Sequence, residues 1–267
     1  MNIMLTFCFL FFLGSCIGWV IELLFRRFIS TANKERKWIN PGFLVGPYLP
    51  LYGFGLCTMY ALAGLDRFVD KNDGLAGKII LFVVMALCMT GIEYIAGIIF
   101  IKGMKVKLWD YSEEWGNIQG IICPRFSIIW AGLGAVYYFL IHPYVVRAVN
   151  WLGENLWFSF IIGFFFGVFL IDTVYSCNIL SKIRKFALES QIIVKYEKLK
   201  SLIRLSAEEN KKKTKFFLSF SSDKPLAEHL KRYYETAKRV MGEGKRNFGK
   251  RKKAEIKSEE RKKKKNE

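Results

Sequence analysis

Five apolar runs, each long enough to cross a lipid bilayer, constrain this chain more than any other feature of its sequence. The hydrocarbon core of a bilayer is about 30 Å thick, so a helix that spans it needs about 20 apolar residues. The runs extend approximately over Ile3–Phe25, Phe43–Leu65, Gly77–Ile101, Ile121–Ile141 and Leu156–Leu180. They predict an all-α membrane protein with about five transmembrane helices.

Charge divides the chain into an apolar part and a basic part. The 267 residues are 52% hydrophobic, yet they carry a formal net charge of +18. Residues 1–181 hold 13 basic and 11 acidic side chains, whereas residues 182–267 hold 28 and 12. A net charge of +16 in the last 86 residues is typical of a water-exposed segment rather than of a membrane domain. We therefore expect a transmembrane domain over 1–181, followed by a basic tail.

The tail has an internal organisation of its own. Apolar residues at near-helical spacing between Ser181 and Leu205 predict that the last span continues into an amphipathic helix. Pro225 is typical of a helix start, and a second short helix is expected to reach Met241. Residues 182–241 are thus predicted to be a cytoplasmic helical segment. Lysine and arginine without apolar periodicity predict a disordered tail over 242–267.

The distribution of Lys and Arg between loops predicts the orientation, because these residues are retained on the cytoplasmic side. With five spans, a cytoplasmic tail places the N-terminus outside and the first and third loops inside. These two loops carry Arg26, Arg27, Lys34, Arg36, Lys37, Lys102, Lys105 and Lys107. The sequence therefore predicts a multi-pass protein of the cell membrane with its N-terminus outside and its C-terminus in the cytoplasm.

The stretch "NPGFLVGPYLPLYGFG", residues 40–55, contains three prolines and four glycines just where the second span should begin. A regular helix from Pro50 to Leu65 would be only about 24 Å long, which is too short for the bilayer core. Residues 42–49 would then be non-helical at membrane depth, where the backbone must be buried in protein or line a watery cavity. Such broken segments form ion and substrate sites in transporters. An interfacial loop before a slightly short span is the alternative.

Acidic residues within the spans point to the same side of the membrane. Glu22, Glu93 and Asp172 lie in the inner halves of their spans, and each costs about 2.5 kcal/mol or more unless it is paired or hydrated. Gly14, Gly18 and Glu22 repeat every four residues, which favours close helix packing along one face of the first span. A purely structural pair between Glu22 and Arg26, one turn further on, is the simplest alternative.

The polar stretch "WDYSEEWGNIQGIICPRFSIIW", residues 109–130, is also expected at the cytoplasmic side, since the loop after the third span lies there. We expect its Arg125 to pair with Glu93 or Asp110. Together with the 40–55 stretch it predicts a cytoplasm-facing polar cavity. The residues expected to line it are Glu22, Asn40, Gly46, Pro47, Pro50, Tyr52, Glu93, Tyr94, Trp109, Asp110, Tyr111, Asn117 and Arg125.

Six ordered motifs within residues 5–145 carry a family resemblance. They are "GWVIE" at 18–22, "NPGFLVGPYLPLYGFG" at 40–55, "EY" at 93–94, "WDYS" at 109–112, a spaced Asn, Gly, Cys, Ser and Trp pattern over 117–130, and "HP" at 142–143. In these motifs the chain resembles the bacterial multi-pass family catalogued as putative ABC-transporter type IV, or CmpB-like permeases. The resemblance implies a bacterial membrane protein associated with transport.

Three departures from the family pattern each remove a charge. The family usually has an arginine where this chain has Pro41, a glutamate near Ile101 and an arginine at Ile121. The joint loss of cations and an anion is expected if they were paired, since an orphaned buried charge would cost several kcal/mol.

Two functions are compatible with these features. The first is a permease subunit that handles a small solute or ion, driven by a separate ATPase, since the sequence has no Walker A loop. The second is a non-transporting scaffold or regulator whose tail binds anionic lipid headgroups or a protein partner. A homo-oligomer is the alternative to a separate ATPase subunit as the protein partner. No enzymatic motif, cofactor site or metal-ligand spacing is present, so neither catalysis nor a cofactor is expected. Nucleic acid is not an expected partner, because no aromatic stacking platform accompanies the basic run.

The predicted topology can be tested by cysteine-accessibility labelling on a background without the six native cysteines. We expect single cysteines at positions 36 and 250 to react only after the membrane is permeabilised, since both lie on the basic side. Labelling of either position from outside the intact cell would contradict the topology.

Overall fold

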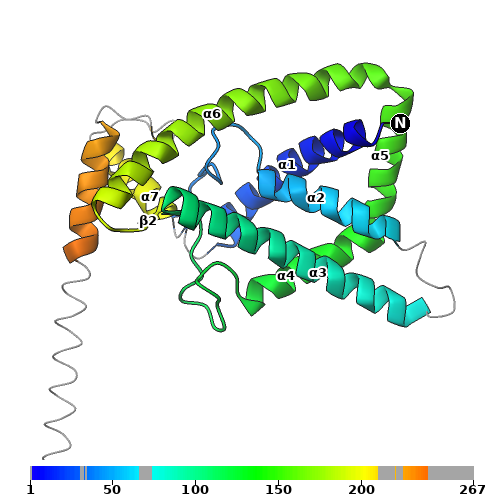
Figure 1. Cartoon of the computed structure of the whole chain (residues 1–267), viewed down its shortest axis with the longest axis horizontal. Coiled ribbons are helices and arrows are strands. Elements are labelled where there is room, and N and C mark those ends of the chain that lie inside the picture. The colour runs from blue at the N-terminus through cyan, green and yellow to red at the C-terminus, as the bar shows by residue number, and fades with distance from the viewer. Residues whose placement is uncertain are drawn as a thin grey trace, which may run out of the picture.

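A computed structural model describes residues 2–30, 33, 35–65, 74–209, 220 and 225–239 of the chain, and it is mostly helical (Figure 1). Four of its helical stretches are long and apolar enough to cross a membrane: Ile3–Phe28, Ile79–Gly103, Pro124–Glu154 and Leu156–Glu189. The predicted all-α membrane architecture is confirmed at this level, and the number of spans stays a prediction. The expected disordered tail, 242–267, lies outside the described residues.

The helices contact one another in a row. α6 (Ser159–Glu189) packs on α1 (Ile3–Phe28), α1 on α2 (Pro50–Ala63), α2 on α3 (Gly74–Ile98), and α3 on α4 (Pro124–Val136). Two π-helical turns extend them, η3 (Ile99–Gly103) after α3 and η4 (Tyr137–Ile141) after α4, and a 3-10 turn, η5 (Leu156–Phe158), precedes α6. The short α2 thus lies inside the row, between longer neighbours.

The α2 helix begins at Pro50, as the sequence predicts, and ends at Ala63. Its 14 residues correspond to about 21 Å at 1.5 Å per residue, so α2 is too short to cross the hydrocarbon core as a regular helix. Proline at the first helical position costs nothing there, because the first N–H groups of a helix have no intrahelical partner. The chain before Pro50, residues 42–49, is non-helical.

Close approach of backbones holds α2 against α1. A Cβ added at Gly14 would lie 2.8 Å from Leu56 Cβ, and one added at Gly18 would lie 2.2 Å from Tyr52 Cβ. On the facing helix, a Cβ at Gly53 would lie 2.3 Å from the hydroxyl of Ser15. The predicted packing face of Gly14 and Gly18 is therefore confirmed, with α2 as the helix packed against it.

The fourth predicted span, 121–141, corresponds to α4 and η4, but the helix does not stop there. α5 (His142–Glu154) follows directly and runs at a steep angle to α4 in Figure 1. The bend lies where the wider turn of η4 meets Pro143, whose ring removes a backbone donor from the helix. α5 is amphipathic and lies at the end of the bundle that also holds the start of α1 (Figure 1).

The tail differs from the expected continuous helix. α6 continues to Glu189 and then ends in a turn, with Gln191 at a φ of 51°. Next come the two-residue strand β2 (Val194–Lys195), which pairs in parallel with β1 (Val106–Lys107), and α7 (Tyr196–Glu209). The prediction of one helix through Leu205 was wrong, because Val106 and Val194 pair in the same core as the apolar face of α7.

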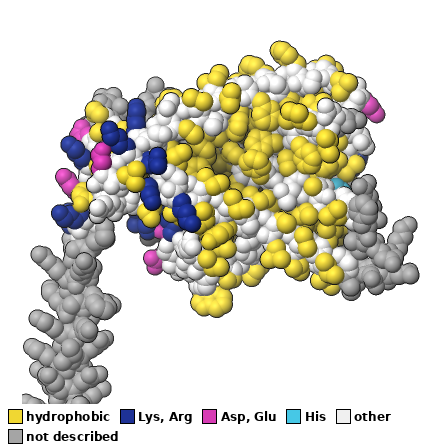
Figure 2. Space-filling view, viewed as in Figure 1, with side chains coloured by type: hydrophobic (Ala, Val, Ile, Leu, Met, Phe, Trp, Pro, Cys, Tyr) yellow, Lys and Arg dark blue, Asp and Glu magenta, His cyan; other side chains and the backbone are white. Residues whose placement is uncertain are grey.

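A further helix, residues 226–239, packs on α7 through Leu230 and Tyr233. This group of elements defines what we call the α7 end of the bundle. Figure 2 shows Lys and Arg side chains gathered at that end and apolar side chains over the rest of the visible face.

Candidate functional site

The segment of residues 40–49 enters the helix bundle from the α7 end. The indole of Trp19 donates to the side-chain carbonyl of Asn40 at 2.7 Å, and the N–H of Leu49 donates to the carbonyl of Ser15 at 2.9 Å. Ser15 lies in the middle of α1. The segment therefore descends from the level of Trp19 to the level of the centre of a transmembrane helix before α2 begins.

Asp172 of α6 binds this segment from the side. Its carboxylate accepts hydrogen bonds from the N–H groups of Val45 and Gly46 at 3.1 and 2.7 Å, and from the hydroxyl of Tyr48 at 2.6 Å. Ser176, one turn further along α6, donates a fourth at 2.9 Å. The carboxylate is thus held by peptide N–H and hydroxyl donors, and it satisfies two N–H groups that lipid could not.

Asn40 supports the same segment from within. Its side-chain amide is 98% buried and donates to the carbonyls of Leu44 and Val45 at 3.2 and 2.9 Å. With the bond from Trp19, the amide uses both of its donors and its acceptor. The segment is a fixed loop rather than an unstructured one.

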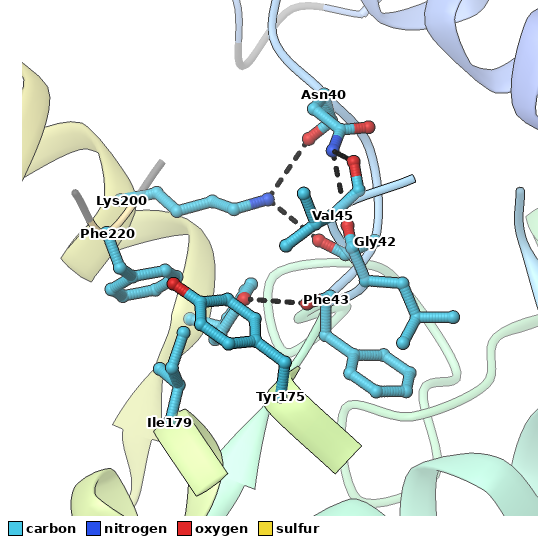
Figure 3. Close-up of a pocket in the computed structure, with 10 residues that line it drawn as sticks. Asn40, Gly42, Phe43, Val45, Tyr175, Ile179, Lys200 and Phe220 are labelled. Atoms are coloured by element: carbon cyan, nitrogen blue, oxygen red, sulfur yellow. Dashed lines mark hydrogen bonds between the residues drawn. The ribbon is translucent and has the colours of Figure 1, made fainter. Parts of the chain in front are cut away.

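A side chain from outside the transmembrane helices completes the site. The amine of Lys200, on α7, donates to the carbonyls of Asn40 and Gly42 at 3.0 and 2.7 Å (Figure 3). Burial lowers the pKa of Lys200 to about 8, and Arg26 adds to this effect while Glu197 opposes it. The amine therefore remains mostly protonated at neutral pH.

A small pocket lies beside Lys200 (Figure 3). Its volume is about 20 Å³, which is room for about one water molecule. It is lined by Asn40, Gly42, Phe43, Leu44, Val45, Tyr175, Ile179, Tyr196, Lys200 and Phe220. Asn40 is thus a predicted cavity residue that does line a pocket, whereas Glu22 and Glu93 do not line this one.

Glu22 belongs to a neighbouring ionic group. Its carboxylate binds Arg26 at 2.8 Å and accepts from the hydroxyl of Tyr52 at 3.0 Å. Arg26 also binds Glu197 of α7 at 3.0 Å. The ion pair between Glu22 and Arg26, which the sequence offered as an alternative, is therefore present. Its contacts with Tyr52 and Glu197 join α1 to α2 and α7.

Glu93 lies in a separate and drier environment. Its side chain is 97% buried in α3 and accepts from the hydroxyl of Tyr111 at 3.1 Å and the indole of Trp130 at 3.0 Å. No ion pair of Glu93 occurs among residues that the structure describes. The rings of Tyr52 and Trp130 lie 5.6 Å apart, so the Glu22 and Glu93 groups meet through these two aromatic side chains.

In the stretch 109–130, residues 109–123 form a folded loop at the α7 end and residues 124–130 begin α4. Lys107 binds Asp110 at 2.6 Å, and Lys195 of β2 also pairs with it. Burial opposes ionisation, but hydrogen bonds from Lys107, Lys195 and Ser112 outweigh it and hold the pKa of Asp110 well below its usual range. Asp110 therefore fixes β2 to the loop before α4.

Arg125 does not pair with Glu93 or Asp110, as the sequence suggested, but with Glu114 at 3.1 Å. Arg125 is exposed at the first turn of α4, so its long side chain reaches the adjacent loop rather than the bundle interior. Asn117 organises that loop by accepting from the N–H of Gly120 at 2.9 Å and donating to the carbonyl of Glu114 at 2.8 Å. These are structural contacts within the loop.

The predicted site residues thus fall into separate groups. Asn40 and Gly46 belong to the loop held by Asp172, and Pro50 and Tyr52 to α2 beside Glu22. Glu93 and Tyr111 form the buried group, whereas Pro47 is exposed and Tyr94 is half-buried. Trp109 donates to the carbonyl of Ile121 at 2.8 Å, a hydrogen bond within the loop before α4.

Sequence reasoning missed several contributors, namely Trp19, Tyr48, Trp130, Glu197 and Lys200, and it did not assign Asp172 to the site. The position of Asp172, an acidic residue within an apolar run, was the sequence feature that could have assigned it to the site. For Lys200 the sequence offers no such signal, because lysines are numerous throughout the tail.

Two of the positions where the family usually carries charge lie together. Ile101 and Ile121 line one small pocket, and a Cβ added at Gly97 would lie 2.2 Å from Ile121 Cγ2. Their proximity is what a paired glutamate and arginine at these positions would require. In this chain both positions carry isoleucine.

The model of the family described as Putative ABC-transporter type IV matches residues 9–177, which is more than half of the chain. The match runs from Phe9 in α1 to Cys177 in α6, and therefore includes Asp172, Glu22, Glu93 and the 40–49 segment. No curated protein and no solved structure matches the chain.

The contacts of Asp172 predict the effect of Asp172→Asn. The N–H groups of Val45 and Gly46 bind different oxygens of the carboxylate, and asparagine keeps only one of these oxygens. Its NH₂ group must face the other N–H, which loses its acceptor and should lose protection. We expect amide exchange in residues 42–49 to accelerate about tenfold, the effect of roughly 1.4 kcal/mol from an unsatisfied buried group. Hydrogen-exchange mass spectrometry of the purified protein measures this.

Ser176→Ala is the matched control for Asp172→Asn, because it removes one of the four hydrogen bonds but leaves both N–H contacts in place. Its exchange should stay near that of the wild type. Equal exchange in wild type and Asp172→Asn would contradict the role of the carboxylate.

Proposed function

The chain belongs to the Putative ABC-transporter type IV family, and on that premise we propose that it is a membrane permease subunit that handles a small solute or ion. ATP hydrolysis would come from a separate ATPase subunit, because the sequence contains no phosphate-binding glycine loop. The α7 end would face the cytoplasm, since Lys and Arg side chains gather there.

One observation carries this proposal: residues 42–49 are non-helical beside the middle of α1 and are held by Asp172 of α6. Transporter sites are commonly built where a helix is interrupted inside the membrane, because the interruption supplies peptide groups and helix ends as ligands. Here the interruption is followed by the start of α2 at Pro50. A polar path from the α7 end would follow the 40–49 segment.

Glu93 is the proposed site residue, and it lies beyond the 40–49 segment, to which Trp130 and Tyr52 of α2 connect it. A carboxylate inside a membrane domain is costly, and both of its observed donors are uncharged. Such a group has an unused capacity to bind a proton or a small cation. The described conformation has Glu93 closed off, so access to it would require movement of the aromatic side chains of Tyr111 or Trp130.

A second candidate function, a non-transporting scaffold or regulator, has its own support. The pocket on the 40–49 segment has room for about one water molecule, and Asp172 is fully occupied by contacts within the chain. In this alternative the polar groups only hold the fold. The basic tail would then provide the activity by binding anionic lipid headgroups, at about 1 kcal/mol per basic residue near the surface.

The permease proposal predicts the outcome of Glu93→Gln. Glutamine keeps the shape and the acceptor for Trp130 but cannot take up a proton or bind a cation by charge. We expect the variant to fold with a near-normal Tm and to lose the solute-dependent growth that distinguishes the wild type from a deletion strain. Growth complementation with a parallel thermal melt of the purified protein measures both properties.

Glu154→Gln is the control, because Glu154 is exposed on α5 at the opposite end of the bundle. It should complement fully. Full complementation by Glu93→Gln as well would remove Glu93 from the site and favour the scaffold function.

The lipid-binding proposal predicts that the segment 182–267, produced alone, binds vesicles containing anionic lipid and ignores neutral ones. Its net charge of +16 provides the attraction, and added salt should weaken binding by screening. Vesicle co-sedimentation measures this. Equal binding to anionic and neutral vesicles would reject an electrostatic role for the tail.

A further inference from the structure

Lys200 is placed in an unusual position for a lysine of a basic tail. It belongs to α7, yet its side chain is only 7% exposed and its amine lies against the 40–49 segment. The amine donates to two main-chain carbonyls, those of Asn40 and Gly42 (Figure 3). Neither carbonyl is part of a helix or strand in the described chain.

Two further groups of α7 surround the same amine. The ring of Tyr196 has its centroid 4.9 Å from the nitrogen, within the range of a cation–π contact. The carboxylate of Glu197 lies 3.9 Å from it. We call these four groups, the carbonyls of Asn40 and Gly42, the ring of Tyr196 and the carboxylate of Glu197, the ammonium cradle.

The cradle has the composition of a site for a small cation. Carbonyl oxygens coordinate hard cations or accept from ammonium groups, an aromatic face attracts positive charge, and a carboxylate supplies the opposite charge. Gly42 has a φ of 75°, in the left-handed region, and a Cβ there would lie 2.5 Å from Leu49 Cδ2. The backbone that supplies one of the carbonyls is thus held in a conformation that glycine permits.

We propose that the ammonium cradle is a binding site for a small monovalent cation or primary ammonium group, and that the side chain of Lys200 is its built-in occupant, a tethered plug between α7 and the 40–49 segment. When Lys200 is removed or withdrawn, the cradle takes a free cation of the same kind. This proposal does not require that the chain transports anything.

The surrounding charges fit a plug that can be released. The desolvation of Lys200 is only partly compensated, since Glu197 also binds Arg26 and is half-exposed. An incompletely compensated cation is held less tightly than one in a closed ion pair. Lys200 can therefore stay protonated in the cradle and still leave it.

The test replaces Lys200 and returns its missing part from solution. Lys200→Ala removes three carbons and the amine of the side chain. Propylammonium has the same three carbons and amine. We expect this variant of the full-length chain to melt several degrees below the wild type and to recover most of that loss in propylammonium chloride, since a ligand that binds only the folded state stabilises it. Tetramethylammonium chloride at equal concentration should not restore it, because that cation cannot donate hydrogen bonds to carbonyls.

Lys200→Met is the second variant, because it keeps an apolar stem and folds even if the smaller residue does not. The methionine side chain fills the space of the lysine carbons and leaves room only at the position of the amine, for a cation the size of ammonium or potassium. Ammonium chloride should therefore raise the Tm of this variant, and propylammonium chloride should not. Lys198→Ala, exposed on the same helix, is the matched control and should show no cation-specific change.

The proposal is supported if each Lys200 variant gains Tm from its own matching cation beyond the gain in tetramethylammonium. It is overturned if all chloride salts change the Tm of both Lys200 variants equally. It is also overturned if the Tm of the wild type or of Lys198→Ala rises as much as that of the Lys200 variants. Because the readout is thermal stability, a negative result would leave the permease proposal to its own test at Glu93.

Discussion

The structure depends on how a stretch of non-helical backbone is accommodated between apolar helices. Peptide groups outside a helix need partners in a membrane domain, since lipid offers none. Asp172 satisfies two N–H groups of the 40–49 segment, Asn40 satisfies two of its carbonyls, and Lys200 satisfies two more. The three polar side chains come from three different parts of the chain, so the segment joins them into one unit.

Helix packing follows from this arrangement. Because the 40–49 segment takes up part of the depth, α2 needs only 14 residues, and the glycines of α1 and α2 allow it to lie directly against α1. That contact brings Tyr52 to Glu22 and to the ring of Trp130, and so connects the ionic group near α7 with the buried Glu93. A change at the α7 end thereby has a short physical route to Glu93.

Local features were predictable from the sequence, and contacts between distant residues were not. Pro50 as the start of α2, the non-helical residues before it and the packing face of Gly14 all follow from backbone geometry within one segment. Three of the four partners of Asp172 lie more than 120 positions away. Two of these three are backbone N–H groups, which every residue except proline carries, so no residue pattern identifies them. Arg125 was assigned to the wrong acid for a similar reason: loop geometry decides which carboxylate its side chain reaches.

A cryo-electron microscopy structure of the full chain in lipid nanodiscs tests the central claim most directly. We predict that residues 42–49 lie non-helical below the headgroup layer, with the N–H groups of Val45 and Gly46 on the carboxylate of Asp172, and that α2 starts at Pro50. A continuous helix from Phe43 facing lipid, or residues 42–49 outside the headgroups with Asp172 away from them, would contradict it.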